Sequence, residues 1–370
     1  MSKSTKIIIG IIIVIIIGGI WYGATREPKE EGVIKIGAIL PLSGPVSIFG
    51  NWIREGLDLA LEDINDSRIN IIYEDSKLDA KEGISAFNKL VDIDNAKIII
   101  SAMSSVSVPL MPLTKDKGIL LFLQDVTYPD ITVGNPLVIR HFIQSDREAS
   151  ILAEYALDEL KIKKVGILYV NDEAGVGAKE AFKRIFEEKG GEVLILESYG
   201  TKDTDTKTQI LKIKNKNVEG IYLFGNGYSW AQALKQIKEL GFEGKILTNT
   251  AMFIKNFREI AGDAAEGVYF TYPYSDTSKE SVERFVSLYK EKYGREPEIE
   301  AYYAWDILHI LVRALEKNNW ETENIEKAIL DIKEFEGAFG KAIITENGDF
   351  LTPIGIGIIE DSQIKELSVR

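Results

Sequence analysis

Short apolar runs alternate with amphipathic stretches of helical length along most of this chain, and this alternation narrows the possible folds more than any other feature. The apolar runs at 33–40 and 97–100 are each followed by a stretch whose apolar residues recur at helical spacing. A short run that is apolar throughout is typical of a strand buried on both faces. The strict strand–helix alternation therefore predicts parallel sheets with helices on both faces.

The same alternation occurs twice. After a short predicted strand at 137–142 and a link, a second set of strands and helices begins near residue 146. In a chain of 370 residues, two successive sets predict two similar lobes rather than one large sheet. The predicted fold class is α/β, with two doubly wound parallel-sheet lobes, and a cleft between lobes is the commonest place for a small ligand.

The last hundred residues predict a different arrangement. Three helices are expected at 278–293, 300–316 and 322–330, and Asn347-Gly348 is a strong turn signal in the hairpin-like end that follows. Helices with such short connections cannot complete a sheet, so we expect them to pack on the first lobe while the final strands return to the second. The chain would then pass between the lobes three times and form a hinge. The predicted units are 1–32 as signal anchor and tether, 33–143 with 272–339 as lobe one, and 144–271 with 340–370 as lobe two.

The N-terminus contains an uncharged run, 7–25, that follows Lys3 and Lys6. As a helix it would be about 28 Å long, close to the hydrocarbon thickness of a bilayer. Basic residues before such a run predict a cytoplasmic N-terminus and delivery of the remainder to the outside. We interpret the run as an uncleaved transmembrane anchor in the cell membrane; the alternative is a cleaved signal peptide and a secreted binding domain.

The composition disfavours several classes of function. The chain has 57 acidic and 44 basic residues, two histidines and no cysteine. Nucleic-acid binding requires clustered Lys and Arg, so no nucleic-acid partner is expected. Thiolate metal sites and thiol nucleophiles are excluded, and His141 and His309 are far from metal-ligand spacing. We therefore expect no metal, no cofactor and no enzymatic activity.

Two loops are the candidate ligand site. The first contains Ser104 and Ser105, between the strand at 97–100 and a predicted helix at 106–117. A helix start after a strand leaves backbone N–H groups unpaired at the carboxyl end of the sheet, where hydroxyl side chains help to hold an anion. The alternative is that both serines only cap the helix. The second loop, 124–127, follows the next strand and would lie beside the first.

Several short sequence motifs occur in a specific order over almost all of residues 33–360. They resemble the leucine/isoleucine/valine-binding protein family, the solute receptors of ABC importers with the type I periplasmic-binding-protein fold. The motifs are Ile36-Gly37, Pro41-Leu42-Ser43-Gly44-Pro45, Gly50, Ser104-Ser105, Pro109, Val126-Thr127, Pro129, Ile260–Gly267, Ala301 and Trp305-Asp306.

The resemblance implies roles for residues of both loops. Ser104 and Thr127 would bind the carboxylate of an amino acid, together with Ser105 and the backbone at Val126. The aromatic residue of the first Gly-rich loop, which lines the side-chain pocket in the family, corresponds to Phe49. These positions agree with the loops selected from the strand–helix pattern.

The sequence departs from the family at the position that binds the ligand's ammonium. The acidic residue of the family corresponds to Thr250, and a tyrosine common in the family corresponds to Ala174. Asp125 stands where the family usually has a small residue, and it is the candidate for the missing charge. Alternatively, Asp125 caps its own turn and the ligand has no ammonium, as in an amide or another small carboxylic acid.

Two further residues complete the predicted site. Asn226 lies in a Gly225-Asn226-Gly227 turn that is expected to line the cleft; it lacks the third glycine of a dinucleotide-binding motif. Tyr302 belongs to an aromatic cluster that is typical of a helix core, and it is the member expected to reach the cleft.

The predicted function is therefore that of an extracellular solute-binding protein of an ABC importer. It would capture a small polar ligand, such as a branched-chain or other amino acid, by closing two lobes. Its partners would be the permease subunits with their ATPases. The alternatives are a sensor of the same fold for a small amide or carboxylic acid and, third, a nucleotide-dependent enzyme.

Overall fold

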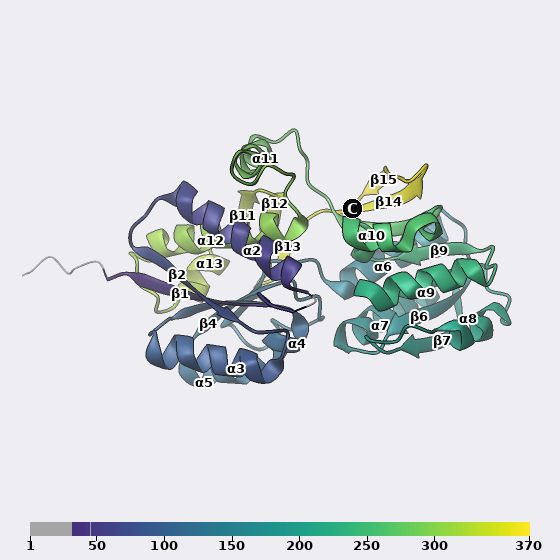
Figure 1. Cartoon of the computed structure of the whole chain (residues 1–370), viewed down its shortest axis with the longest axis horizontal. Helices are drawn as coiled ribbons and strands as arrows, with labels where there is room; N and C mark the ends of the chain where they lie inside the picture. The colour runs from purple at the N-terminus through teal and green to yellow at the C-terminus, as the bar shows by residue number, and fades with distance from the viewer. Residues whose placement is uncertain (1–31, 45) are drawn as a thin grey trace, which may run out of the picture.

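The computed structural model describes residues 32–44 and 46–370. The predicted anchor, 7–25, lies outside these residues. Two lobes lie side by side, and several segments of the chain connect them (Figure 1). Among the described residues, the structure contains no helix with the length and apolar character needed to cross a membrane.

The first lobe contains a sheet of five parallel strands in the order β2-β1-β3-β4-β5. Its side chains alternate between two cores: Ile98 and Ile100 contribute to one, and Ile99 to the other. Successive side chains of a strand point to opposite faces, and every position of this strand is apolar, so both of its faces are buried. This burial confirms the predicted parallel sheet. The strands are β1 (Ile34–Leu40), β2 (Ile69–Asp75), β3 (Ile98–Ala102), β4 (Leu120–Gln124) and β5 (Val138–Arg140).

Helices cover both faces of this sheet, with α2 and α12 on one side and α3 and α5 on the other (Figure 1). The helices α2 and α12 pack so closely at Gly56 that a Cβ there would lie 2.3 Å from the carbonyl oxygen of Ala301. The three late helices pack on the first lobe, as predicted. The helices are α2 (Ser47–Ile64), α3 (Ala80–Asn88), α5 (Met111–Lys117), α11 (Glu280–Tyr293), α12 (Ile299–Lys317) and α13 (Ile325–Leu330).

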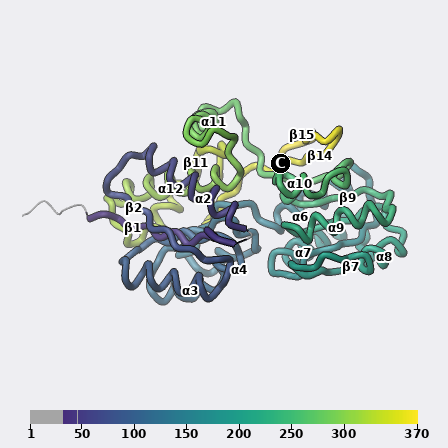
Figure 2. The backbone as a smooth tube through the Cα atoms, in the orientation of Figure 1, coloured from purple at the N-terminus to yellow at the C-terminus, as the bar shows by residue number. Residues whose placement is uncertain are grey.

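The second lobe contains a seven-stranded sheet in the order β15-β14-β10-β9-β8-β6-β7. The last two strands run antiparallel and extend one edge, so the C-terminal segment, yellow in Figure 2, ends on this lobe as predicted. The strands are β6 (Lys164–Val170), β7 (Glu192–Tyr199), β8 (Gly220–Phe224), β9 (Lys245–Thr248), β10 (Val268–Pro273), β14 (Ile354–Glu360) and β15 (Gln363–Val369). The helices are α6 (Ser145–Asp158), α7 (Glu173–Glu188), α8 (Lys207–Lys214), α9 (Gly227–Glu239) and α10 (Lys255–Ala261).

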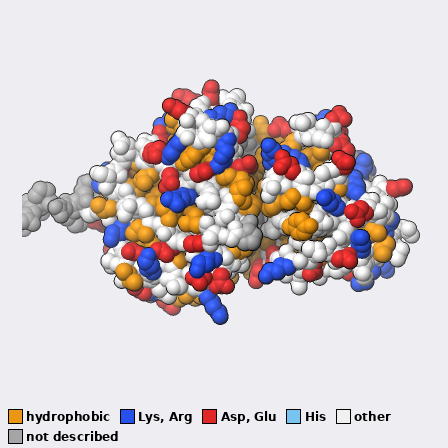
Figure 3. Space-filling model, in the orientation of Figure 1, with side chains coloured by type: hydrophobic (Ala, Val, Ile, Leu, Met, Phe, Trp, Pro, Cys, Tyr) orange, Lys and Arg blue, Asp and Glu red, His pale blue; other side chains and the backbone are white. Residues whose placement is uncertain are grey.

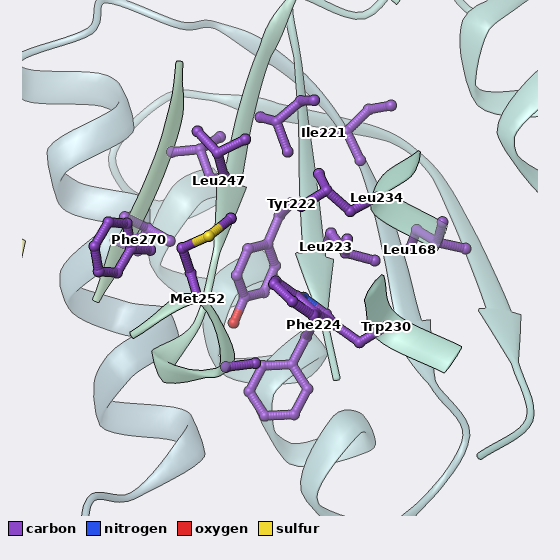
Figure 4. Packing of buried hydrophobic residues seen from close by; sticks show 14 of the residues in the cluster. Leu168, Ile221, Tyr222, Leu223, Phe224, Trp230, Leu234, Leu247, Met252 and Phe270 are labelled. Atoms are coloured by element: carbon purple, nitrogen blue, oxygen red, sulfur yellow. The ribbon is translucent and has the colours of Figure 1, made fainter. Parts of the chain in front are cut away.

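The core of the second lobe is centred on Tyr222 of β8 (Figure 4). Its ring stacks on Phe182 of α7 with 4.1 Å between ring centroids. The indole Nε1 of the nearby Trp230 donates a 2.9 Å hydrogen bond to the hydroxyl of Thr248. Burial of such large aromatic side chains gives this lobe its own core.

Two predicted helices differ from the structure. The helix α2 begins at Ser47, inside the segment expected to be a loop, so Phe49 lies in its first turn. The segment expected to be one helix at 106–117 is divided into α4 (Ser104–Ser107), a 3-10 turn and α5, since Pro109 and Pro112 cannot donate the backbone hydrogen bonds of a continuous helix.

The segment after α13 forms a small antiparallel sheet before the chain returns to the second lobe. Residues 340–370 were expected to lie entirely in lobe two. Instead, Ala342 and Phe350 are buried in the core that α12 shares with the first sheet. The chain therefore joins the second lobe only from β14 onward. The strands of the small sheet are β11 (Glu334–Gly337), β12 (Gly340–Ile344) and β13 (Phe350–Leu351).

Candidate ligand-binding site

The two predicted loops leave neighbouring strands at the same edge of the first sheet. The parallel register of β3 and β4 pairs Ala102 with Gln124. Ser104 follows the first of these residues by two positions and Thr127 follows the second by three. The topology therefore brings the two candidate anion-binding hydroxyl residues to the carboxyl ends of adjacent strands, where ligands bind in open α/β sheets.

The first loop turns sharply before its serines. Met103 adopts a φ of 71° and occupies the N-cap position of α4, without a side-chain hydrogen bond to the helix. Ser104 is the first helical residue and is half-buried, whereas Ser105 is exposed. The alternative in which these serines cap the helix is therefore not observed. Their hydroxyl groups are not used to cap α4.

The second loop is held by a buried arginine. Arg140 of β5 is 1% exposed, and its Nη1 donates hydrogen bonds to the carbonyl oxygens of Val126 and Tyr128. Its Nε pairs with Asp349 at 2.7 Å. Val126 is fully buried, which leaves the half-buried Thr127 as the hydroxyl residue of this loop. Arg140 thus fixes the backbone on both sides of Thr127.

The two lobes touch beside these loops. Phe49 of α2 lies 5.8 Å, between ring centroids, from Phe257 of α10 in the second lobe. Met103 packs against the cores of both lobes. A Cβ at Gly177 of α7 would lie 2.4 Å from Cγ of Pro129, which follows the second loop. The two lobes are therefore in contact near Ser104 and Thr127.

Thr250 already has a carboxylate partner. Its amide donates a 3.0 Å hydrogen bond to Oε1 of Glu148, and its hydroxyl donates to the same oxygen. The hydroxyl of Thr271 also donates to this oxygen at 2.8 Å. Glu148 is 1% exposed, and its burial raises its pKa to about 7 despite these hydrogen bonds. A buried carboxyl group from α6 thus lies beside position 250.

Asp125 acts electrostatically on a second acid, Glu300. Its backbone has a φ of 52°, and burial raises the pKa of its carboxyl group to about 7. Glu300, in the first turn of α12, is 1% exposed, and burial together with the charge of Asp125 raises its pKa well above the usual value. No hydrogen bond from the turn stabilises the Asp125 carboxylate among the described residues, so the predicted capping role is not observed.

Asn226 and Tyr302 belong to neither of the two loops. Asn226 is exposed at the N-cap of α9 and makes no side-chain capping hydrogen bond. Tyr302 is half-buried, with its ring 4.6 Å from that of Phe285 and 5.0 Å from that of Phe339. Tyr302 therefore contributes to the packing of α12, and its predicted contact with a ligand stays a prediction.

Glu148, Glu300 and Arg140 carry no signal of a site in the sequence. Glu148 and Glu300 each lie in the first turn of a helix, where an acid is the ordinary partner of the helix dipole and gives no signal of burial. Arg140 next to His141 was treated as part of a strand end. Their positions depend on long-range packing. For Glu300 and Arg140 this is the packing of α12 and of the segment around Asp349 near the first sheet, and for Glu148 it is the packing of α6 against Thr250 and Thr271.

The outer surface carries acidic and basic side chains interspersed over both lobes on the face seen in Figure 3. A cavity of about 910 Å³ lies where α2 and the segment after α11 approach Lys255 of the second lobe. Its lining includes Trp52, Arg54, Glu55 and Arg295 but none of the predicted ligand-binding residues. It is therefore distinct from the two loops.

Comparisons with known proteins agree with this architecture. The Leu/Ile/Val-binding protein homolog 3 of Brucella melitensis is 26% identical over 330 residues, which cover 86% of this chain and 89% of that protein. A leucine-binding protein from Thermotoga maritima has a TM-score of 0.85 at 28% identity, over 91% of this chain and 98% of that one. A solute-binding protein of an ABC transporter from R. palustris, solved with benzoate, shares the fold with a TM-score of 0.81 at 18% identity, over 91% and 96% of the two chains.

The family model described as periplasmic binding protein matches residues 33–362, which include both lobes and all three passages between them. Because this match covers more than half of the chain, this chain belongs to the periplasmic binding protein family.

Proposed function

We propose that this protein is the solute-binding component of an ABC importer, and that it captures a small ligand bearing a carboxylate, such as an amino acid, between its lobes. The permease and its ATPases would be its partners. The observation that carries the proposal is the pair of loops with Ser104 and Thr127 at the carboxyl ends of adjacent strands, beside the contact between lobes.

The chemistry of the loops supports an anionic group on the ligand. Ser104 and Thr127 each bring a hydroxyl group that donates hydrogen bonds, and the first turn of α4 adds backbone N–H groups. Arg140 keeps the second loop in place through backbone carbonyls rather than by pointing at the ligand. A carboxylate that bridges the two loops would be enclosed when the lobes close.

A second candidate is a receptor of the same fold for an aromatic acid. The R. palustris protein solved with benzoate motivates it, since benzoate has a carboxylate and no ammonium. A sensor that passes the same closure to a signalling partner is a further alternative, and neighbouring genes for permeases and ATPases would separate the importer from the sensor.

A ligand panel tests the proposed function. Purified residues 33–370 should unfold at a higher temperature in the presence of one class of small carboxylate, because a ligand that binds only the folded state stabilises it. At about a hundred times its dissociation constant the gain is about 2.7 kcal/mol. The panel contains the proteinogenic amino acids, their des-amino acids, their amides and benzoate. If no compound raises the unfolding temperature, the proposed function is wrong.

We also propose that residues 7–25 anchor the protein in the cell membrane with the binding domain outside. The full-length protein should then stay in the membrane fraction after high-salt and carbonate washes, because about 28 Å of apolar helix holds it there. Residues 33–370 produced alone should be soluble and serve as the control. A released protein whose N-terminus begins near Thr25 would instead identify a cleaved signal peptide.

A further inference from the structure

The lobes meet along an apolar contact at the start of α10. Phe253 and Ile254, which directly precede α10 in the second lobe, pack against a cluster that contains Ile299 of α12 in the first lobe. Within the first turn of α10, the ring of Phe257 lies 5.8 Å from that of Phe49. The start of α10 therefore lies against the starts of both α12 and α2.

Charged side chains of opposite sign flank this apolar contact. Lys255, the first residue of α10, follows Ile254, and Glu298, at the N-cap position of α12, precedes Ile299. Lys255 and Glu298 both line the cavity of about 910 Å³ between α2, α10 and the start of α12. One cation and one acid, each from a different lobe, therefore lie on the same cavity.

Arg258 is a second cation on the side of α10. Its Nη1 donates hydrogen bonds of 3.1 and 2.9 Å to the carbonyl oxygens of Met252 and Phe253. These bonds hold the guanidinium group against the segment that packs on the first lobe. The negative charge of Glu298 acts on Arg258, so the two groups interact across the boundary between lobes.

The carboxyl group of Glu298 is not used to cap α12, since it makes no capping hydrogen bond there. Burial raises its pKa, whereas the positive charges of Arg295, Lys255 and Arg258 act in the opposite direction. Arg295 belongs to the same lobe and already forms an ion pair with Glu55. The other two cations belong to the second lobe.

We propose that Glu298 attracts Lys255 and Arg258 across the boundary between lobes, and that this attraction stabilises the closed form and raises ligand affinity. We call these three residues the boundary charges. The inference rests on the proposed function, since it requires a solute that is enclosed when the lobes close. In an open form the lobes are farther apart and the attraction is weaker. Apparent affinity rises with the fraction of molecules in the closed form.

Salt should weaken the effect of the boundary charges. Lys255 is exposed, and its pair with Glu259 on the same helix, at 3.8 Å, is also exposed. The screening length falls from about 30 Å at 10 mM salt to about 3 Å at 1 M. An attraction between partly exposed groups that do not touch should therefore act at low salt and be almost lost at high salt.

The test is a charge exchange across the boundary. Glu298→Lys and Lys255→Glu each place like charges on the two lobes, so each should weaken binding by about threefold to tenfold at low salt. The double variant restores opposite charges and should recover most of the lost affinity. At about 1 M salt all three variants should bind within about twofold of wild type.

The measurement is calorimetric titration of the full-length protein in a nonionic detergent, at about 10 mM and about 1 M sodium chloride. The titrant is the compound of the panel described above that gives the largest thermal shift. Arg258 is left unchanged in all variants, because its replacement would also remove its hydrogen bonds to the backbone.

Two controls separate attraction between lobes from damage to α12. Glu316→Lys makes the same change of charge at an exposed position of α12, about 27 Å along the helix from Glu298, and should bind as wild type does. A lysine at position 298 also meets the positive end of the helix dipole. Lys255→Glu, in the other lobe, does not repair the start of α12, so recovery in the double variant reports the attraction itself.

Closure can also be measured directly. The chain has no cysteine, so Ser85→Cys on α3 and Arg184→Cys on α7, both at exposed positions, can carry a pair of spin labels. Without added compound, at low salt, Glu298→Lys should reduce the share of molecules at the distance of the present structure, in which the lobes touch. The charge exchange should restore that share.

The outcomes separate this inference from the proposed function. If Glu298→Lys binds the compound as tightly as wild type at low salt, the boundary charges do not stabilise closure, while solute capture stands. A double variant that binds no better than Glu298→Lys leads to the same conclusion. If no compound of the panel binds to the wild-type protein, the proposed function is wrong and the label distances decide. An unchanged distance distribution in Glu298→Lys would then contradict the role of the boundary charges.

Discussion

Replacing both Ser104 and Thr127 by alanine should reduce affinity for the captured carboxylate by at least a hundredfold. Each hydroxyl donates a hydrogen bond to a charged group, worth about 1.5–3 kcal/mol, so each single variant should bind about ten to a hundred times more weakly. The two residues lie on different loops and bind the same group, so their effects need not add. Calorimetric titration with the compound that gives the largest thermal shift measures all three variants.

The fold should survive these changes, because neither hydroxyl caps α4 or bonds within the core. Ser85→Ala removes an exposed hydroxyl from α3 and is the control, with affinity expected to equal wild type. Wild-type binding by the Ser104→Ala, Thr127→Ala double variant would show that the ligand lies elsewhere, and the cavity beside Trp52 and Arg295 would become the next place to test.

Gly177→Ala should weaken ligand binding by roughly tenfold to a hundredfold without lowering the stability of the ligand-free protein. The new methyl group would lie 2.4 Å from Cγ of Pro129 across the boundary between lobes, so closure would be strained by about 1–3 kcal/mol. Within α7 itself, alanine is favoured over glycine by up to about 1 kcal/mol. Affinity and unfolding temperature should thus change in opposite directions, which titration and thermal denaturation measure.

A rescue variant distinguishes strain between lobes from damage to α7. Pro129→Ala removes the ring atoms that the new methyl group would meet, so Gly177→Ala with Pro129→Ala should recover most of the affinity lost in Gly177→Ala. Val176→Ala, at the adjacent exposed position of α7, should bind as wild type does. If the double variant binds no better than Gly177→Ala, closure at this contact does not control affinity.

The parallel sheets could be predicted because their signal is local. Ile98, Ile99 and Ile100 are apolar at every position, and this run is possible only where both faces of a strand are buried. The return of the chain to the second lobe could also be predicted, since three helices with short connections cannot complete a sheet of their own. The position of Ser104 and Thr127 at one edge followed from the order of parallel strands.

The environment of the site could not be predicted, because it depends on contacts between residues far apart in the chain. Glu300 becomes a buried acid only because Gln124 holds the start of α12 against β4. Thr250 suggested a missing charge, yet Glu148, about a hundred residues earlier, supplies a carboxylate to it. No local pattern connects these pairs. The small sheet was also misplaced, since the burial of Phe350 in the first lobe is a tertiary contact.

The discontinuity of the first lobe has a consequence for biosynthesis. Its sheet is translated first, but α12, which buries Ile36 and Ile100 on one face, emerges only after β6 to β10 of the second lobe and their helices. Until then that face of β1, β3 and β4 is covered only in part, by α2, and the apolar surface left exposed favours aggregation and binding by chaperones. The strands β6 to β10 and their helices, by contrast, are contiguous and can assemble as they leave the ribosome. The lobe whose sheet is made first is thus completed only after most of the second lobe has been made.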